Sequence, residues 1–423
     1  MAISGLIIAL TAPVMGQRAD QPGRRSLQVA LWTALTVACM AAMALVADDT
    51  AYFWLGLVLL AAGSIAFEFA EIGYFSMLPG IATPQTVGRV SGLGWGMGYV
   101  GGIVVLGIAF VGFLAPAAEP GRHGILNLPA EGGLNVRAFC LLAAAWFLLF
   151  ALPLLVAARR RERRLAPNEP QRRLGVRASY AALFREIKAL WRGDRRTALF
   201  FLAAAVYRDG LAGVFGFGAV LAATVYGLSP SEIILFGIAG NVAAAAGAFA
   251  AGVLDDRFGP KPVICASLAL MVLDGLALFF VEGPAGFWAL GLALCLLVGP
   301  AQSASRTFLV RVTPKGREGQ FIGLYATSGR AVSFLAPGAF ALFTGIGGDD
   351  RYGILAIALV LAAGLAALVP LAPPARPRQR VVSWRCRRAP RPAPRRAARG
   401  CSRPQGWRTP ARWRPARRPS RSA

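Results

Sequence analysis

Long apolar stretches alternate with short polar connections along most of the chain. A helix needs about 20 apolar residues to cross the hydrocarbon core of a bilayer. Ten segments reach that length, and residues 2–16 form a shorter apolar segment ahead of them. The ten segments are 26–47, 52–77, 90–114, 136–157, 197–226, 232–254, 262–281, 287–308, 321–345 and 352–371. This pattern predicts an all-α, polytopic membrane protein.

The charges of the connections alternate in step with the apolar segments. Basic connections at 18–25, 89, 159–164, 257–261 and 311–317 take turns with connections that are nearly neutral or acidic, such as 48–49 and 349–350. Connections rich in Lys and Arg stay on the cytoplasmic side of a membrane. We therefore expect a multi-pass protein of a bacterial inner membrane, with its basic connections in the cytoplasm.

The longest connection, 158–196, divides the apolar part into two halves, 1–157 and 197–371. Inside it, Tyr180, Leu183, Phe184, Ile187, Leu190 and Trp191 recur at helical spacing between basic residues. This spacing predicts an amphipathic helix on the cytoplasmic membrane surface. Residues 372–423 are rich in Arg and Pro and carry no acid. Such a composition predicts a disordered tail.

Composition separates the charge of the tail from that of the body. The chain has 423 residues, is 56% hydrophobic and carries a formal net charge of +25. Of its 45 basic residues, 17 lie in the tail, so the rest of the chain carries 28 against 20 acids. The tail either binds anionic lipid or nucleic acid nonspecifically, or is a frameshift product of GC-rich coding. For the body we expect the lipid bilayer as a partner and no specific nucleic acid.

Cysteine and histidine exclude further chemistry. The six cysteines form no Cys-x-x-Cys motif or Cys/His cluster, and the one histidine, His123, lies in a polar connection. We expect neither a metal site nor a cofactor, and no catalytic mechanism that depends on histidine.

A polar signature occurs in both halves. The residues in register are Gly16, Asp20, Gly23, Arg24 and Arg25 in the first copy and Gly252, Asp256, Arg257, Gly259 and Lys261 in the second. A second repeat pairs Gly88-Arg89 with Gly316-Arg317 and Gly92 with Gly323. Glycines permit close backbone approach, and the aspartate can accept bonds from helix N-termini or arginines. We expect these residues, together with Arg306, to support a cytoplasmic gate.

At these residues the chain resembles the major facilitator superfamily, whose loop signature reads Gly-x-x-x-Asp-Arg/Lys-x-Gly-Arg-Arg/Lys. More narrowly it resembles the branch of autophagy-related vacuolar amino-acid effluxers and their bacterial relatives. The segments that carry this likeness are 88–95, 98–102, 207–210 and 299–306. The resemblance implies two six-helix pseudo-repeats. Against that pattern the first helix and the start of the second, roughly 40 residues, are expected to be missing.

Ionisable side chains inside the apolar segments are costly in hydrocarbon, and they usually face a cavity or a partner. Glu68 and Glu71 lie three residues apart, on one face of a helix. Two close carboxylates tend to keep one proton, which suits proton coupling. Arg208 could hold a solute carboxylate, and Asp209 an amine or a proton. In each case a structural ion pair or hydrogen bond is the alternative. The remaining candidates are Tyr207, Asn241, Asp274 and Gln302.

Repeated halves with polar residues between them are typical of alternating access. We therefore expect a secondary transporter of a small polar solute, for which the resemblance implies amino acids. No ATP-binding motif is present, so a gradient of protons or of the solute would drive it. Two alternatives remain open. One is a non-transporting scaffold or truncated remnant, and the other is a membrane-embedded lipid-modifying enzyme, although the chain carries no His or paired-Asp metal motif.

Overall fold

Helices make up nearly all of the computed structural model, which describes residues 2–20, 25–83, 85–114, 122–129, 131–165 and 176–372. The α-helices are α1 (Ala2–Ala19), α2 (Arg25–Ala42), α3 (Phe53–Ser76), α4 (Leu78–Ile81), α5 (Val87–Ala109), α6 (Leu134–Leu165), α7 (Val176–Gly193), α8 (Arg195–Thr224), α9 (Pro230–Phe258), α10 (Pro260–Phe280), α11 (Gly283–Val312), α12 (Glu318–Val332), α13 (Leu335–Gly347) and α14 (Tyr352–Leu368). Shorter elements are η1 (Met43–Leu45), η2 (Thr50–Tyr52), η3 (Phe110–Leu114), η4 (Glu131–Gly133) and an antiparallel pair of strands, β1 (Arg122–His123) and β2 (Leu128–Pro129).

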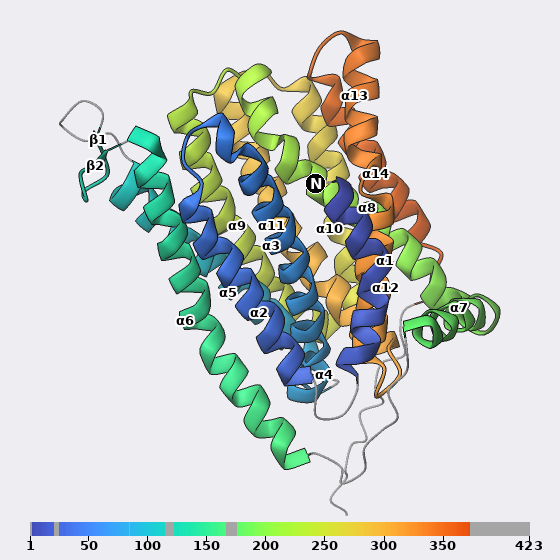
Figure 1. The fold of residues 1–423 in the computed structure, drawn as a ribbon. Coiled ribbons are helices and arrows are strands. Elements are labelled where there is room, and N and C mark those ends of the chain that lie inside the picture. The colour runs from blue at the N-terminus through green and yellow to red at the C-terminus, as the bar shows by residue number, and fades with distance from the viewer. Residues whose placement is uncertain are drawn as a thin grey trace, which may run out of the picture. The chain divides into compact units, whose positions relative to one another are not determined.

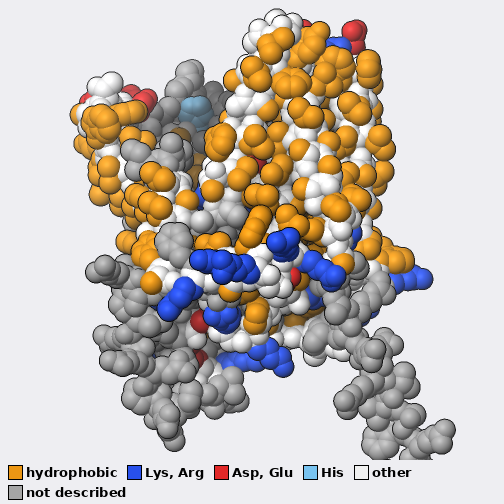
Figure 2. Space-filling model, turned by 90° about the vertical axis from the view of Figure 1, so that its right-hand side faces the viewer, with side chains coloured by type: hydrophobic (Ala, Val, Ile, Leu, Met, Phe, Trp, Pro, Cys, Tyr) orange, Lys and Arg blue, Asp and Glu red, His pale blue; other side chains and the backbone are white. Residues whose placement is uncertain are grey.

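The helices agree with the predicted membrane spans. Among the described residues, nine helical segments are long and apolar enough to cross a membrane, and Tyr352–Leu368 is apolar but shorter. Large apolar side chains are also exposed on the bundle, among them Trp54 at 71%, Phe280 at 78% and Ile346 at 79%. Figure 2 shows the apolar side chains covering the upper part of one face and the Lys and Arg side chains gathered in a band below them. An exposed apolar surface of this kind fits a lipid environment.

The packing of the helices repeats in the two halves. In the first half α2 packs against α3 and α6, and α1 packs against α3. In the second half α10 packs against α11 and α14, and α9 packs against α11. The helices α1, α2, α3, α5 and α6 therefore correspond to α9, α10, α11, α12–α13 and α14. The helix α8, which packs against α14, has no counterpart among the described helices of the first half. The repeat predicted from the loop signatures is thus present in the fold.

The predicted span 321–345 is broken into two helices, α12 and α13, which was not expected. Ser333 and Phe334 separate them, and Pro337 occupies the first turn of α13. Proline lacks an N–H and clashes with the preceding turn, so it is tolerated at the start of a helix and not inside one. The break lies beside α8 and next to Arg330, in the part of the bundle that holds the site described below.

The two halves meet along two close helix crossings, α1 with α12 and α5 with α9 (Figure 1). Glycines make both crossings possible. A Cβ added to Gly16 would lie 2.0 Å from the Gly319 carbonyl oxygen, and one added to Gly92 would lie 2.6 Å from the Ala248 carbonyl oxygen. Farther along α5, Gly98 has no atom within 4 Å of the same position. The halves therefore pack at the end of the bundle that carries Asp20 and Asp256, called the basic end below.

Candidate functional site

A small central cavity lies where the two halves face each other. Its volume is about 40 Å³. Its lining comes from α3 and α5 of the first half and from α8, α11 and α12 of the second, namely Glu68, Glu71, Ile72, Phe75, Trp95, Arg208, Gln302, Arg306, Ile322, Tyr325 and Ala326. Five of the residues that the sequence singled out thus meet here: Glu68, Glu71, Arg208, Gln302 and Arg306. No group of three or more side chains suited to hold a metal ion occurs in the described part of the chain.

An ion pair joins the halves beside this cavity. The Arg330 guanidinium, on α12, donates to Glu68 Oε2, on α3, at 2.5 Å. The Glu68 side chain is only 12% exposed, whereas that of Arg330 is 42% exposed. The pair leaves Glu71 as the second carboxylate of the cavity, within electrostatic reach of Glu68, Arg306, Arg208 and Arg330. Of the two close carboxylates predicted from the sequence, Glu68 therefore forms an ion pair, and Glu71 forms none with a described residue.

Arg208 reaches the cavity from α8 and leans on α12. Its Nη1 donates to the Tyr325 carbonyl oxygen at 3.2 Å, and its guanidinium lies 4.1 Å from the centre of the Tyr325 ring. The close approach depends on Gly329, since a Cβ there would lie 3.1 Å from Arg208 Nη1. Arg208 thus keeps donor groups available toward the cavity while its position is set by α12.

Two aspartates form the contact at the basic end, and they do so symmetrically. Asp20, after α1, accepts from the backbone amides of Gly319 at 2.6 Å and Gln320 at 2.8 Å, at the start of α12. Asp256, near the end of α9, accepts from the amides of Gly88 at 2.9 Å and Arg89 at 3.2 Å, at the start of α5. A carboxylate at a helix N-terminus satisfies free N–H groups and the positive end of the helix dipole.

Each half therefore caps a helix of the other half. The amides involved pair Gly88 and Arg89 with Gly319 and Gln320, so the second repeat is shifted from the Gly316-Arg317 register that the sequence suggested. The shift has a simple cause. Gly88 and Gly319 are each the second residue of their helix, whereas Gly316 lies two residues before α12 begins.

The other signature residues act within one half or reinforce the caps. Arg25 donates to Asp20 at 3.0 Å and to the Ser76 carbonyl oxygen at 2.8 Å. Lys261 Nζ donates to the carbonyl oxygen of Val369 at 2.7 Å and to that of Leu371, so it caps the end of α14. Gly259 has a φ of 93° in the turn between α9 and α10, a conformation that favours glycine. Arg257 lies over the Phe258 ring.

Some predictions fall where the structure gives no description. Gly23 and Arg24 of the first signature copy lie outside the described residues, and so do residues 373–423 of the predicted tail. The predicted amphipathic helix coincides with α7, whose Tyr180 hydroxyl donates to the Leu10 carbonyl oxygen at 3.0 Å. That bond ties α7 to α1.

Tyr207 and Asp209 flank Arg208 in sequence but point elsewhere. The Tyr207 side chain is fully buried, and its hydroxyl lies 2.6 Å from Ser305 Oγ on α11. Asp209 Oδ2 accepts from the Ala336 amide at 2.6 Å, in the first turn of α13. Neither residue lines the central cavity. Consecutive residues of a helix diverge by about 100°, so only one of the three can face the cavity directly.

The cap on α13 gives a stability prediction. Replacing Asp209 by alanine is expected to destabilise the protein by about 1 kcal/mol, since the first amides of α13 lose their acceptor. Asp209→Asn keeps an acceptor oxygen and should retain most of that stability. Thermal unfolding of both variants in detergent measures the difference. If Asp209→Asn were as stable as the parent protein and yet inactive, the side chain would act on the solute rather than on α13.

Asn241 and Asp274 lie away from the central cavity. Asn241 Nδ2 donates to the Gly237 carbonyl oxygen at 2.8 Å and lines a separate, largely apolar cavity of about 180 Å³ within the second half. Asp274 lies on α10 between Met271 and Gly275, two residues that line the same cavity. The structure therefore brings neither side chain to Glu68, Glu71 or Arg208.

Several residues of the site were missed in the sequence. Arg330 lies inside the predicted span 321–345 and meets the same criterion that singled out Glu68, an ionisable residue within an apolar segment. Phe75, Trp95 and Tyr325 carry no such signal, because aromatic residues are common in membrane spans. Only the fold shows that their rings surround the guanidinium groups of Arg208 and Arg306.

Comparisons with known proteins agree with this architecture. The family model described as "Vacuole effluxer Atg22 like" matches residues 1–374. The chain is 24% identical over 369 residues to the MFS-type transporter YxiO of Bacillus subtilis (strain 168), a match that covers 87% of this chain and 82% of YxiO. It is 26% identical over 298 residues to autophagy-related protein 22-2 of Aspergillus clavatus, covering 66% of this chain and 46% of that protein. The chain thus spans less than half the length of this fungal relative.

Solved structures with the same fold are also transporters. An outward-facing bacterial homologue of the iron transporter ferroportin superposes with a TM-score of 0.63 at 16% identity, covering 87% of this chain and 88% of that one. The proton:xylose symporter XylE of the major facilitator superfamily gives a TM-score of 0.64 at 14% identity, covering 88% of this chain and 85% of that one. These proteins are transporters, not enzymes, and they share their fold with this chain, which is accordingly a multi-pass membrane protein with a transporter fold. With the family model matching residues 1–374, the chain belongs to the Atg22-like vacuole effluxer family of the major facilitator superfamily.

Proposed function

We propose that the protein transports amino acids across its membrane by alternating access. The central cavity supports this proposal, because carboxylates and guanidinium groups from both halves line one small space. An amino acid carries one group of each sign and can bind carboxylates with its amine and arginines with its carboxylate. The resemblance to vacuolar amino-acid effluxers favours the same class of solute.

The positions of the contacts support the alternating-access part. The halves meet at the basic end through Asp20, Asp256 and the glycine crossings, while a Cβ added to Gly98 of α5 would meet no atom within 4 Å. If the basic end faces the cytoplasm, as the positive-inside rule implies, this arrangement is closed toward the cytoplasm. Transport then requires the caps at Asp20 and Asp256 to separate while the opposite end closes.

Flux through purified protein in liposomes tests the proposal. The protein is reconstituted into liposomes that are preloaded with a mixture of unlabelled amino acids, and exchange against each labelled amino acid is measured. Sugars and polyols serve as negative solutes, and protein-free liposomes give the background. The proposal expects saturable exchange of at least one amino acid. A protein that exchanges sugars but no amino acid would have a different solute, and one that exchanges none of the solutes would fit a non-transporting scaffold.

A second prediction concerns protons. Glu71 is the central carboxylate without an ion pair among the described residues, so it is our candidate for the group that binds and releases a proton during transport. Glu71→Gln should reduce the accumulation of the amino acid that a pH gradient drives by about tenfold or more. Exchange of the amino acid at equal pH on both sides should continue. Glu68→Gln is the matched variant, and it should weaken both activities because it breaks the ion pair with Arg330. Unchanged pH-driven accumulation in Glu71→Gln would contradict this assignment.

A further inference from the structure

Arg306 is a buried cation that forms no ion pair with a described residue, although the Glu71 carboxylate lies within its electrostatic reach. Its side chain lies on α11, and the residue is only 8% exposed. Its guanidinium makes no hydrogen bond or ion pair with any described residue, and its Nε is buried without a partner. A guanidinium offers five N–H donors and stays charged at any physiological pH. Burying such a charge without hydrogen bonds or a counter-ion is strongly unfavourable.

Two aromatic rings hold this guanidinium in place. It lies 3.8 Å from the centre of the Phe75 ring and 4.2 Å from that of Trp95. Trp95 is itself held by a bond from its Nε1 to the Tyr99 hydroxyl at 3.3 Å. Contacts with ring faces offset part of the cost of burying the charge. They leave the N–H groups in the plane of the guanidinium unused, so a planar acceptor such as a carboxylate fits the remaining edge.

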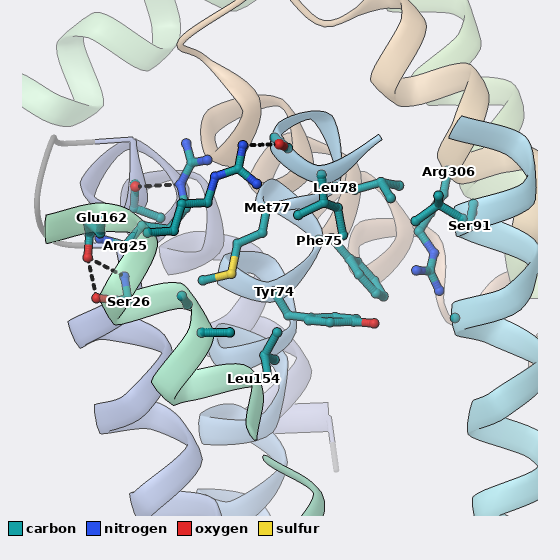
Figure 3. A pocket seen from close by; sticks show the side chains of 18 of the residues that line it. Arg25, Ser26, Tyr74, Phe75, Met77, Leu78, Ser91, Leu154, Glu162 and Arg306 are labelled. Atoms are coloured by element: carbon teal, nitrogen blue, oxygen red, sulfur yellow. Dashed lines mark hydrogen bonds between the residues drawn. The ribbon is translucent and has the colours of Figure 1, made fainter. Parts of the chain in front are cut away.

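The space around Arg306 is open to a ligand on two sides. Arg306 lines the central cavity and also a larger cavity of about 420 Å³ at the basic end. Figure 3 shows its side chain at one wall of the larger cavity, across from Arg25, Ser26 and Glu162. The central cavity holds roughly one or two water molecules, which is enough for a carboxylate but not for a whole amino acid. A solute bound at Arg306 therefore needs the adjoining space for its other groups.

The charged side chains around the central cavity do not balance, and an anion would neutralise the excess positive charge. Glu68 is paired with Arg330. That leaves Glu71 as the remaining carboxylate facing two guanidinium groups, Arg208 and Arg306. Gln302, four residues before Arg306 on the same face of α11, lines the cavity as well and adds an amide donor. The site thus has a surplus of one positive charge and of N–H donors.

We propose that Arg306 is the carboxylate-binding residue of the solute site, so that the protein selects solutes that carry a carboxylate. This inference rests on the proposed transport function and names the solute group that the site recognises. The guanidinium binds the carboxylate through two parallel N–H bonds, with Phe75 and Trp95 fixing the plane.

Competition in the liposome exchange assay tests the carboxylate requirement without any mutation. The amino acid that is exchanged best is competed with its amide, which lacks the carboxylate charge, and with its desamino acid, which lacks the amine. The desamino acid is expected to compete, and the amide is expected to compete at least about tenfold less well. Equal competition by the amide would overturn the inference and leave the proposed amino-acid transport intact.

Two variants locate the requirement at Arg306. Arg306→Gln should raise the KM for the amino acid about 100-fold, and Arg306→Lys about tenfold, because lysine keeps the charge but not the planar pair of donors. Arg351→Gln is the control, because Arg351 pairs with Glu282 and lines neither cavity, and it should not alter the discrimination between acid and amide. An Arg306→Gln protein that folds, exchanges the amino acid with the parent KM and still rejects the amide would overturn the assignment.

The remaining outcomes separate the inference from the proposed function. If no amino acid is exchanged but the desamino acid is, in an Arg306-dependent manner, the carboxylate site stands and the amino-acid assignment fails. If nothing is exchanged, the thermal stability of the purified protein decides. The desamino acid at millimolar concentration should raise the Tm of the parent protein and not that of Arg306→Gln. The absence of any such difference would overturn the inference.

Discussion

Replacing Gly16 by leucine is expected to prevent the basic end of the bundle from closing. A Cβ at this position would lie 2.0 Å from the Gly319 carbonyl oxygen and 2.6 Å from its carbonyl carbon. Both atoms belong to the backbone of α12, so no side chain can move aside. Overpacking of this kind costs about 2 kcal/mol or more, which shifts a two-state equilibrium roughly 30-fold away from the closed arrangement. Transport should fall by a similar factor, since each cycle must pass through that arrangement.

The measurement is a distance across the basic end. Gln85, before α5, and Lys315, before α12, are both exposed and belong to different halves. Spin labels on cysteines at these two positions, in a background without the native cysteines, report the separation of the halves. Gly5→Leu is the matched control, since it lies on the same helix and has no atom within 4 Å of an added Cβ. The leucine at position 16 should lengthen the distance and the one at position 5 should not. A closed distance in Gly16→Leu would show that the α1–α12 crossing does not control the gate.

The same crossing shows what could be predicted from the sequence. Hydropathy locates the spans because a bilayer demands uninterrupted apolar helices, and this demand leaves a strong pattern along the chain. The contacts of the two signature aspartates were also predictable. Asp20 and Asp256 stand at matching places of a repeat, and an acid beside arginines at a helix end can accept bonds from a helix N-terminus or from an arginine. The structure confirms the fold and shows both aspartates as caps on the opposite half.

The central site was less predictable, because the cost of an ionisable residue in a span does not say where its partner lies. Asp209 and Arg208 are adjacent and equally unusual in sequence. Arg208 faces the cavity, whereas Asp209 caps α13, and that difference depends on the break between α12 and α13. Pro337 was a local sign of that break, although its consequence for a residue on α8 could not be seen from the sequence alone.

Arg306 illustrates the same limit from another side. In sequence it ends an apolar segment near a basic connection, which suggested a role in the gate. Its surroundings come from Phe75 on α3 and Trp95 on α5, in the other half of the chain. Contacts between distant segments decide whether such an arginine meets water, a carboxylate or an aromatic ring. The sequence pattern of α11 itself does not predict these contacts.

Acidification is expected to close the basic end through Asp20. Burial raises the pKa of Asp20, in the connection after α1, from its ordinary value of 3.8 to about 6, against the opposing effect of the Gln320 and Gly319 amides and of Arg25. Glu318, which bonds to Arg25, raises it further. When the halves separate, Asp20 meets water and its pKa returns toward 3.8. The closed arrangement therefore takes up a proton that the open one releases, and lowering the pH through this window favours closure.

The size and direction of the effect follow from that difference. The increase in the closed-to-open ratio is complete below about pH 4, amounts to about tenfold at pH 5, and is lost above pH 6. The spin-label distance between positions 85 and 315 measures the ratio from pH 8 to pH 5. Asp20→Asn cannot titrate and should make the ratio less dependent on pH in this window, whereas Asp256→Asn, the symmetric variant, should weaken closure and keep the pH dependence. A closed population that grows with rising pH, or one that responds to acid as strongly in Asp20→Asn as in the parent protein, would show that another group senses the proton. Asp20 and Asp256 occupy equivalent places in the two halves. Comparing the two asparagine variants therefore distinguishes the effect of titrating Asp20 from the effect of losing a helix cap.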